Sequence, residues 1–216
     1  AAQPDATAAP GAGAATPAVT AALPSGPQTA ANAMPALPPP IPPQAAAEFA
    51  RALQAMKAGN VTDAELDLKQ LTIEYPAYKG PRLDLGIIYL QSGRLAEAQA
   101  AFQAVLALDA DDAVANDELG MVLRRQGKFG DAEAAYSRAI AARPDYLPAH
   151  LNLGILYDLY LGHPHKALDQ YQRYVALGGG DKRVPGWIIE LRHRVGLPAQ
   201  APAAAPKSPA ASKEPT

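Results

Sequence analysis

Cysteine is absent from the 216-residue sequence, which excludes disulfide bonds, thiolate catalysis and cysteine-ligated zinc. No stretch approaches the roughly 20 uninterrupted apolar residues that a membrane-spanning helix needs, because proline repeatedly interrupts the alanine-rich N-terminal region. A strong excess of one charge is missing as well, since 19 Lys and Arg residues oppose 21 Asp and Glu residues. The sequence therefore offers neither a transmembrane segment nor a general basic field for nucleic acid.

Aromatic and charged residues are scarce at both ends of the chain, and this divides it into three parts. All 13 aromatic residues and 36 of the 40 charged residues lie in residues 45–196. Of the 22 prolines, 11 fall in residues 1–44 and 5 in residues 197–216. Sequence rich in alanine and proline, without aromatic residues, cannot bury enough surface to fold. We therefore predict one globular domain at 45–196 between a disordered linker and a disordered tail.

The central segment contains an internal repeat of 34 residues. Leu-Gly pairs begin at residues 85, 119 and 153, and an aromatic residue follows the first two pairs at Phe102 and Tyr136. A degenerate copy precedes them, with Ala52 and Gly59 one period upstream of Gly86 and Gly93. Apolar residues recur at helical spacing within each copy. The register predicts helix pairs in residues 45–78, 79–112, 113–146 and 147–181, followed by a lone helix at 185–195.

This repeat resembles the tetratricopeptide repeat, whose 34-residue pattern places Leu-Gly, Tyr, Ala and an aromatic residue at set positions. The resemblance is carried by Leu85-Gly86-x-x-Tyr89, Leu119-Gly120-x-x-Leu123 and Leu153-Gly154-x-x-Tyr157. The tryptophan position of the pattern holds another residue in every copy, and the last copy has one extra residue before Gly162. The resemblance implies an all-α fold: an α-solenoid of four helix-turn-helix repeats, closed by a C-terminal capping helix.

Two sets of glycines carry separate expectations. Gly86, Gly120 and Gly154 would each weaken a helix by about 1 kcal/mol, so their regular placement predicts that helices approach one another closely there. Gly178-Gly179-Gly180 follows the last repeat helix and precedes no strand. It is therefore predicted to be a hinge, in which a substitution such as Gly179→Leu costs little stability.

The resemblance also implies where a partner binds, because tetratricopeptide arrays bind mainly along the concave face formed by their first helices. The family's groove positions, carried over residue by residue, predict a mostly apolar surface made by Phe49, Leu53, Met56, Leu83, Ile87, Leu90, Asp117, Met121, Arg124, Arg125, Leu151, Ile155 and Asp158. Such a surface suits an amphipathic helix or an extended apolar peptide. The Lys and Asn that grip a terminal carboxylate in chaperone-binding relatives are missing from these positions.

No motif in the sequence points to catalysis, so we predict no enzymatic activity, catalytic residue or cofactor. Phosphate-binding loops, nucleophile elbows and metal-binding His-Glu helices are missing. His163 and His165 flank a proline, but no third ligand has a recognisable spacing, so no metal site is predicted. Arg124 and Arg125 have two interpretations, an anchor for an anionic group or a solvated edge of the groove.

The architecture is similar to that of exported bacterial tetratricopeptide proteins of pilus, secretion and envelope assembly. These pair a short array with a low-complexity linker and end in a helix with a Trp-Ile-x-x-Leu pattern, here Trp187-Ile188-Ile189-Glu190-Leu191. An Ala-Ala start before a proline-rich run is typical of residues just past a signal cleavage site or a lipidated cysteine. We expect a periplasmic or otherwise exported adaptor for a protein or peptide, with a cytoplasmic location still open. The alternative is a self-assembling structural subunit whose groove mediates homo-oligomerisation.

Overall fold

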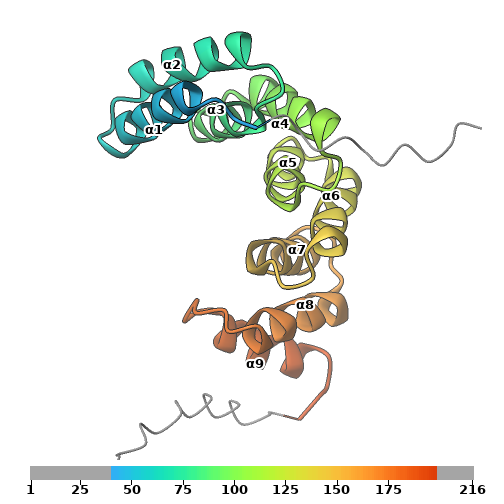
Figure 1. The fold of residues 1–216 in the computed structure, drawn as a ribbon. Helices are drawn as coiled ribbons and strands as arrows, with labels where there is room; N and C mark the ends of the chain where they lie inside the picture. Colours follow the sequence, from blue (N-terminus) through green and yellow to red (C-terminus); the bar gives the residue numbers. More distant parts are fainter. Residues whose placement is uncertain (1–39, 199–216) are drawn as a thin grey trace, which may run out of the picture. The chain divides into compact units, whose positions relative to one another are not determined.

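The computed structural model describes residues 40–198, which form nine α-helices and no β-strand (Figure 1). The helices are α1 (Pro43–Lys57), α2 (Val61–Glu74), α3 (Lys79–Gln91), α4 (Leu95–Leu108), α5 (Ala113–Arg125), α6 (Phe129–Ala142), α7 (Leu147–Leu159), α8 (Pro164–Ala176) and α9 (Val184–Arg194). The predicted all-α fold of four helix pairs and a final lone helix is confirmed. No helix in this part of the chain is long and apolar enough to cross a membrane.

The N-terminal end of the predicted domain differs from the structure in detail. α1 begins at Pro43, so Pro43 and Gln44 belong to a helix rather than to the linker predicted for residues 1–44. Proline is favoured at the first position of a helix because its missing N–H would have had no partner there. The rest of the predicted linker, residues 1–39, and the predicted tail from residue 199 onward lie outside the described residues.

Each of the first three repeats folds back on itself at a glycine that follows its first helix. These glycines are Gly59, Gly93 and Gly127, with φ of 82°, 76° and 77°, a left-handed conformation that glycine adopts without steric cost. In the second repeat the N–H groups of Gly93 and Arg94 donate to the carbonyls of Leu90 and Tyr89. This is a Schellman motif, which satisfies carbonyls at the end of a helix. The fourth repeat, with its extra residue, turns at Gly162 instead.

The glycines of the Leu-Gly pairs lie where the two helices of a repeat come closest. A Cβ atom on each would lie 2.5 Å from a ring carbon of the second helix: Gly86 from Phe102, Gly120 from Tyr136, and Gly154 from Tyr171. All three rings are buried, so each occupies the space that a side chain on its glycine would need. The predicted close approach of the helices is confirmed, and it explains why poor helix formers recur at this position.

The prediction that Gly178-Gly179-Gly180 forms an unconstrained hinge is wrong at its middle residue. A Cβ atom on Gly179 would clash with the ring of Tyr174. The Gly179 N–H donates to the Tyr174 carbonyl at 2.9 Å, and the Tyr174 hydroxyl accepts from the N–H of Asp181 at 3.1 Å. Tyr174 therefore fixes this segment against the end of α8, and Gly179→Leu is expected to clash rather than to cost little.

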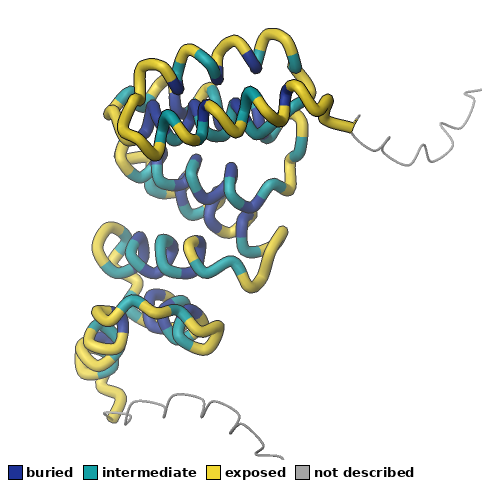
Figure 2. Tube along the Cα trace, turned by 60° about the vertical axis from the view of Figure 1, so that its left-hand side comes forward, coloured by how far each residue is buried: buried dark blue, intermediate teal, exposed yellow. Residues whose placement is uncertain are grey.

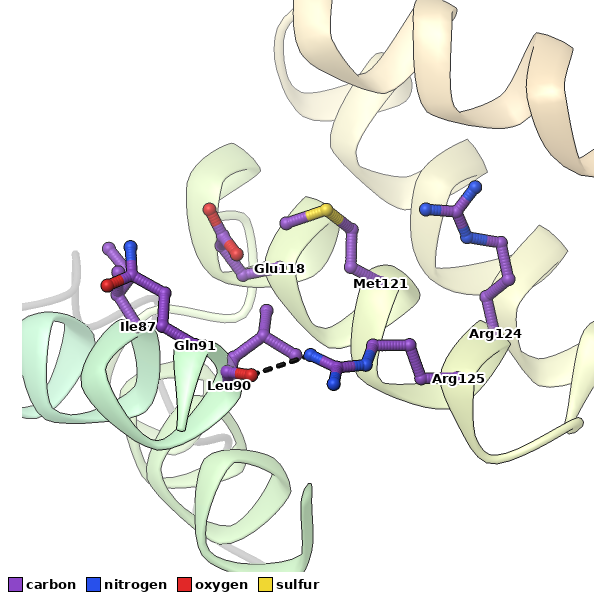
Figure 3. Close-up of a pocket in the computed structure, with 7 residues that line it drawn as sticks. All are labelled: Ile87, Leu90, Gln91, Glu118, Met121, Arg124 and Arg125. Carbon is purple, nitrogen blue, oxygen red and sulfur yellow. Dashed lines mark hydrogen bonds between the residues drawn. The ribbon is translucent and has the colours of Figure 1, made fainter. Parts of the chain in front are cut away.

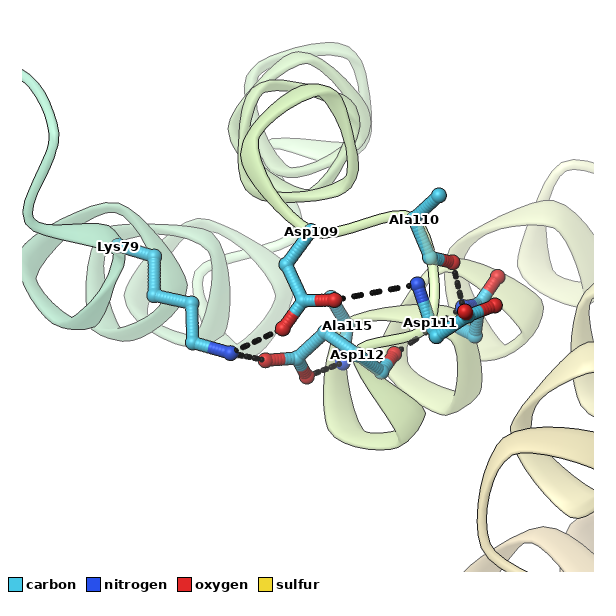
Figure 4. A network of polar contacts seen from close by, with 7 residues as sticks. Lys79, Asp109, Ala110, Asp111, Asp112 and Ala115 are labelled. Atoms are coloured by element: carbon cyan, nitrogen blue, oxygen red, sulfur yellow. Dashed lines mark hydrogen bonds and ion pairs between the residues drawn. The ribbon is translucent and has the colours of Figure 1, made fainter. Parts of the chain in front are cut away.

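A polar network joins the start of α3 to the turn between α4 and α5 (Figure 4). Lys79 Nζ lies 2.6 Å from Oδ2 of Asp109 and 2.6 Å from Oδ2 of Asp112. Asp112 also caps α5 by accepting from the N–H of Ala115 at 2.9 Å. Burial alone would raise the pKa of Asp112, but the ammonium of Lys79 and the helix amide outweigh it and hold that pKa below its ordinary value. The network links the second repeat to the third.

Buried side chains from all nine of the described helices form one main hydrophobic core, and Figure 2 shows buried positions interspersed with less buried ones along the helices. α9 covers the last repeat, with Leu191 buried and the Trp187 ring 5.4 Å from the Tyr171 ring. Ile188 and Val195 are partly buried against the same core. α9 therefore turns an apolar side toward the last repeat, and Trp187 packs half-buried against the core.

Candidate protein-binding groove

The first helix of each repeat carries half-buried apolar side chains, which we call the first-helix stripe. It consists of Phe49, Leu53 and Met56 on α1, Leu83 and Ile87 on α3, Met121 on α5, and Leu151 and Ile155 on α7. α5 contacts both α3 and α7, so their parts of the stripe adjoin. The Leu-Gly leucines of the same helices, Leu85, Leu119 and Leu153, are only 6 %, 6 % and 3 % exposed. This difference in exposure agrees with the helical spacing of the two sets.

The stripe is hollowed between α3 and α5 by a recess of about 270 Å³ (Figure 3). The recess is lined by Ile87, Leu90 and Gln91 from α3 and by Glu118, Met121, Arg124 and Arg125 from α5. Five of these seven are among the predicted groove residues. The volume is below the usual range for drug-sized ligands, and it suits side chains of a peptide.

Three predicted groove residues differ from the expectation that they face a partner. Leu90 and Asp117 are buried, at 6 % and 2 % exposed, because both turn toward neighbouring helices. Asp117 accepts hydrogen bonds from Nδ2 of Asn152 on α7, at 3.0 Å and 3.2 Å. Asp158 is half-buried and ion-paired with Arg194 of the capping helix. Asp117 and Asp158 therefore hold the array together, and Leu90 contributes only its edge to the recess.

The two predicted arginines have different surroundings. Arg125 Nη1 donates to the carbonyl oxygen of Leu90 at 2.6 Å and so ties the end of α5 to the end of α3. The guanidinium of Arg124 lies 5.7 Å from the centre of the Tyr160 ring, a cation–π distance. Within residues 40–198 neither arginine forms an ion pair with a carboxylate. Arg124 is half-buried and Arg125 is exposed, and each is held by one contact within the fold.

The sequence interpretation missed two acidic residues on these helices, Asp84 on α3 and Glu118 on α5. They occupy the same repeat position, 34 residues apart. Burial raises the pKa of Asp84 to about 6. Burial, with a smaller effect of the neighbouring Asp117, raises the pKa of Glu118 to about 7. The recurrence of an acid at one register position could have revealed them, but the family's groove positions do not include that position.

A second recess of about 470 Å³ lies on the side of the second helices, lined by residues of α4, α5 and α6. Its walls include the polar side chains of Gln99, Gln103, Lys128, Asp131 and Arg138. The walls of this recess are more polar than those of the recess between α3 and α5, although Leu106, Leu119 and Leu123 also line it. We therefore place the candidate binding surface on the first helices.

Between residues 40 and 198 no three His, Asp or Glu side chains are gathered closely enough to hold a metal ion. His163 and His165 are both exposed at the start of α8. His150 is buried, with its ring nitrogens 2.9 Å from the Pro144 carbonyl oxygen and 2.8 Å from Oε1 of Gln170. Its two ring nitrogens are thus used within the fold.

Two family models of the tetratricopeptide repeat match the sequence, one at residues 55–117 and the other at 111–177. Together they span more than half of the chain and contain seven of the described helices completely, α2 to α8. The chain is a tetratricopeptide repeat protein. Proteins of this family are generally non-catalytic scaffolds, and the fold supports a role as an adaptor between proteins. No curated protein matches the sequence significantly.

Solved structures of other tetratricopeptide repeat proteins are similar to this one. A crystal structure of MamA is 25% identical with a TM-score of 0.61, covering 68% of this chain and 85% of that one. MamA from Desulfovibrio magneticus RS-1 is 20% identical with a TM-score of 0.62, covering 73% and 88%. PilF from Pseudomonas aeruginosa is 18% identical with a TM-score of 0.64, covering 70% and 69%. The likeness to the last two shows the fold alone.

Proposed function

We propose that the protein is a non-catalytic adaptor that binds an apolar peptide or an amphipathic helix along the first-helix stripe. The observation that carries this proposal is the stripe itself, which continues over four repeats and is hollowed between α3 and α5. The Leu-Gly leucines of these helices are almost fully buried, whereas the stripe residues keep part of their surface exposed. Apolar residues left at a surface in a contiguous patch usually mark an interaction site.

The stripe is also suited to binding because the repeats hold it in place before a partner arrives. All of its residues except Leu53 pack against the main core while keeping part of their surface free. Burying one large apolar side chain of a partner contributes about 1.5–3 kcal/mol. Several such contacts along a preformed surface can offset the entropy lost on association. An extended or helical segment that spans several repeats makes these contacts at once.

The wider setting that we propose is the assembly of a bacterial envelope machine, such as a pilus or a secretion system. The support is the sequence resemblance to exported tetratricopeptide proteins, together with the Trp187–Leu191 pattern of the capping helix. A periplasmic or otherwise exported location belongs to this proposal. Fractionation of the native cells tests it, because the protein is expected with the envelope fractions and its recovery with cytosolic markers would contradict it.

Self-assembly is the second candidate, because large apolar side chains are also exposed away from the stripe. Leu66 and Ile73 on α2 are 69 % and 74 % exposed, and Leu159 at the end of α7 is 69 % exposed. If copies pack through these surfaces and the stripe, the mass measured by light scattering rises with protein concentration. An adaptor for another protein predicts a constant monomer mass over the same range.

Replacing Ile87 by asparagine is expected to weaken partner binding at least tenfold. Ile87 lies at the centre of the stripe and on the wall of the recess, so a polar amide there removes an apolar contact from the bound state. The probe is a peptide selected from a phage-displayed library of random 12-residue peptides on the immobilised full chain. Affinity is measured by isothermal titration calorimetry, and the helical content by circular dichroism.

Ile73→Asn is the matched control, because it makes the same change at an exposed isoleucine on α2. It should leave the affinity within twofold of the original chain. The proposal fails if both variants bind the selected peptides equally well, since the stripe would then not be the binding surface. A loss of helical signal in Ile87→Asn would instead show that Ile87 belongs to the core, and would refute the groove assignment directly.

A further inference from the structure

Glu118 is the acidic residue that lines the recess between α3 and α5, together with the apolar side chains of Ile87, Leu90 and Met121 (Figure 3). Its carboxyl group is half-buried. In the part of the chain that the structure describes, no Lys, Arg or His side chain pairs with it and no hydrogen-bond donor reaches it. A carboxylate that has lost much of its water without gaining a partner is unfavourable in the free protein.

The two arginines of the same recess do not relieve this charge. Arg125 donates to the Leu90 carbonyl at 2.6 Å, and Arg124 lies over the Tyr160 ring. The charge of Arg124 acts on Asp117 instead. Burial raises the pKa of Asp117 to about 6, and the hydrogen bond from Asn152 and the positive charge of Arg124 lower it in part. Both arginines emerge from the last turn of α5, whereas Glu118 lies in its first half. The carboxylate of Glu118 is therefore left to a group from outside the fold.

We propose that the partner inserts a basic side chain, lysine or arginine, beside Glu118, and packs a neighbouring apolar side chain against Ile87 and Met121. This inference rests on the proposed function and specifies the chemistry of the partner. An ammonium or guanidinium group of the partner would replace the water that Glu118 loses on burial. Hydrogen bonds between oppositely charged groups are stronger than hydrogen bonds between neutral groups. The apolar neighbour fills the rest of the recess.

The same proposal applies to Asp84 in the preceding repeat. It occupies on α3 the position that Glu118 occupies on α5, it is half-buried, and no ion pair to it is found among residues 40–198. Helices packed in contact lie about 8–10 Å apart. Two basic residues of a partner reach both acids if they are three residues apart in a polyproline II segment, which has three residues per turn and rises about 3.1 Å per residue. In a helix the matching separation is seven residues, at 1.5 Å each.

The test uses the phage-displayed library of random 12-residue peptides on the immobilised full chain. Peptides whose binding is lost in Ile87→Asn are expected to contain Lys or Arg next to a large apolar residue. Glu118→Gln, which keeps the size and polarity of the side chain, should weaken their binding at least fivefold. Glu190→Gln is the control, because Glu190 is an exposed acid on α9, and it should leave the affinity unchanged.

A double-mutant cycle then assigns the contact. Replacing the basic residue of a selected peptide by glutamine should cost the original chain at least fivefold in affinity and cost Glu118→Gln almost nothing. Selected peptides that depend on Ile87 but lack a basic residue, or that bind Glu118→Gln unchanged, would overturn the inference and leave the proposed function standing. If no selected peptide depends on Ile87, the proposed function fails and the inference fails with it.

Discussion

Gly120→Leu should destabilise the fold by at least about 3 kcal/mol, which is large for one substitution. A Cβ atom at residue 120 would lie 2.5 Å from Cε1 and 2.6 Å from Cδ1 of Tyr136. The Tyr136 ring is fully buried, so it cannot swing aside as a flexible side chain would. The helices α5 and α6 must separate or the ring must leave the core, and both changes disrupt close packing. Urea denaturation of the full chain, followed by circular dichroism, measures the loss.

Gly130→Leu is the matched control for this effect. Gly130 lies in the first turn of α6, has an ordinary helical φ, and has open space where a Cβ atom would be. Leucine is a better helix former than glycine by up to about 1 kcal/mol. The control should therefore be as stable as the original chain or slightly more stable. Equal stabilities for Gly120→Leu and Gly130→Leu would show that the Leu-Gly glycine has no packing role.

Glu118→Gln should stabilise the fold by about 2 kcal/mol at pH 8 and leave it nearly unchanged at pH 4.5. Burial, together with Asp117, raises the pKa of Glu118 from 4.5 to about 7 in the folded chain. Between about pH 4.5 and pH 7, Glu118 keeps its proton in the folded state but has lost it in the unfolded state. The stability of the original chain therefore falls as the pH rises through this window, and glutamine removes that loss.

The measurement is the difference in free energy of unfolding between Glu118→Gln and the original chain at several pH values. Asp84 and Asp117 also have raised pKa values, but they are present in both proteins and largely cancel in the difference. A difference that does not depend on pH would contradict the desolvation of Glu118. Taken with the binding experiment, Glu118→Gln is expected to raise the free energy of unfolding and to lower the affinity for the partner. This pattern is expected when a binding residue destabilises the free protein.

Much of the fold follows from the sequence because each repeat is a local unit. The 34-residue register fixes where Leu-Gly, the turn glycine and the aromatic residue recur, and helix pairs pack mainly on their neighbours. The roles of Gly86, Gly120 and Gly154 could be predicted for this reason. The constraint on Gly179 could not be predicted, because it comes from contact with Tyr174. No position that recurs in the repeats indicates this contact.

The candidate site was predictable in part. Exposure of Ile87 and Met121 follows from helical spacing, whereas burial of Asp117 depends on Asn152 one repeat later, a partner that no spacing within a helix identifies. Arg125 likewise turns toward the Leu90 carbonyl because of how α3 and α5 pack. The environment of Glu118 depends on the walls of the recess, which two repeats form together. Residue type and register predict which apolar residues form the stripe, whereas the surroundings of its charged residues depend on how the repeats pack.

A photo-activated cross-linking residue at Gln91, compared with the same residue at Gln103, tests the central claim most directly. Both glutamines are exposed, so neither substitution should disturb the core. Gln91 lies on the wall of the recess between α3 and α5, whereas Gln103 lies at the recess beside α4 and α6. Illumination of the native cells should yield a discrete protein adduct from position 91 and none from position 103. An adduct from position 103 with none from position 91 would contradict partner binding on the first-helix stripe.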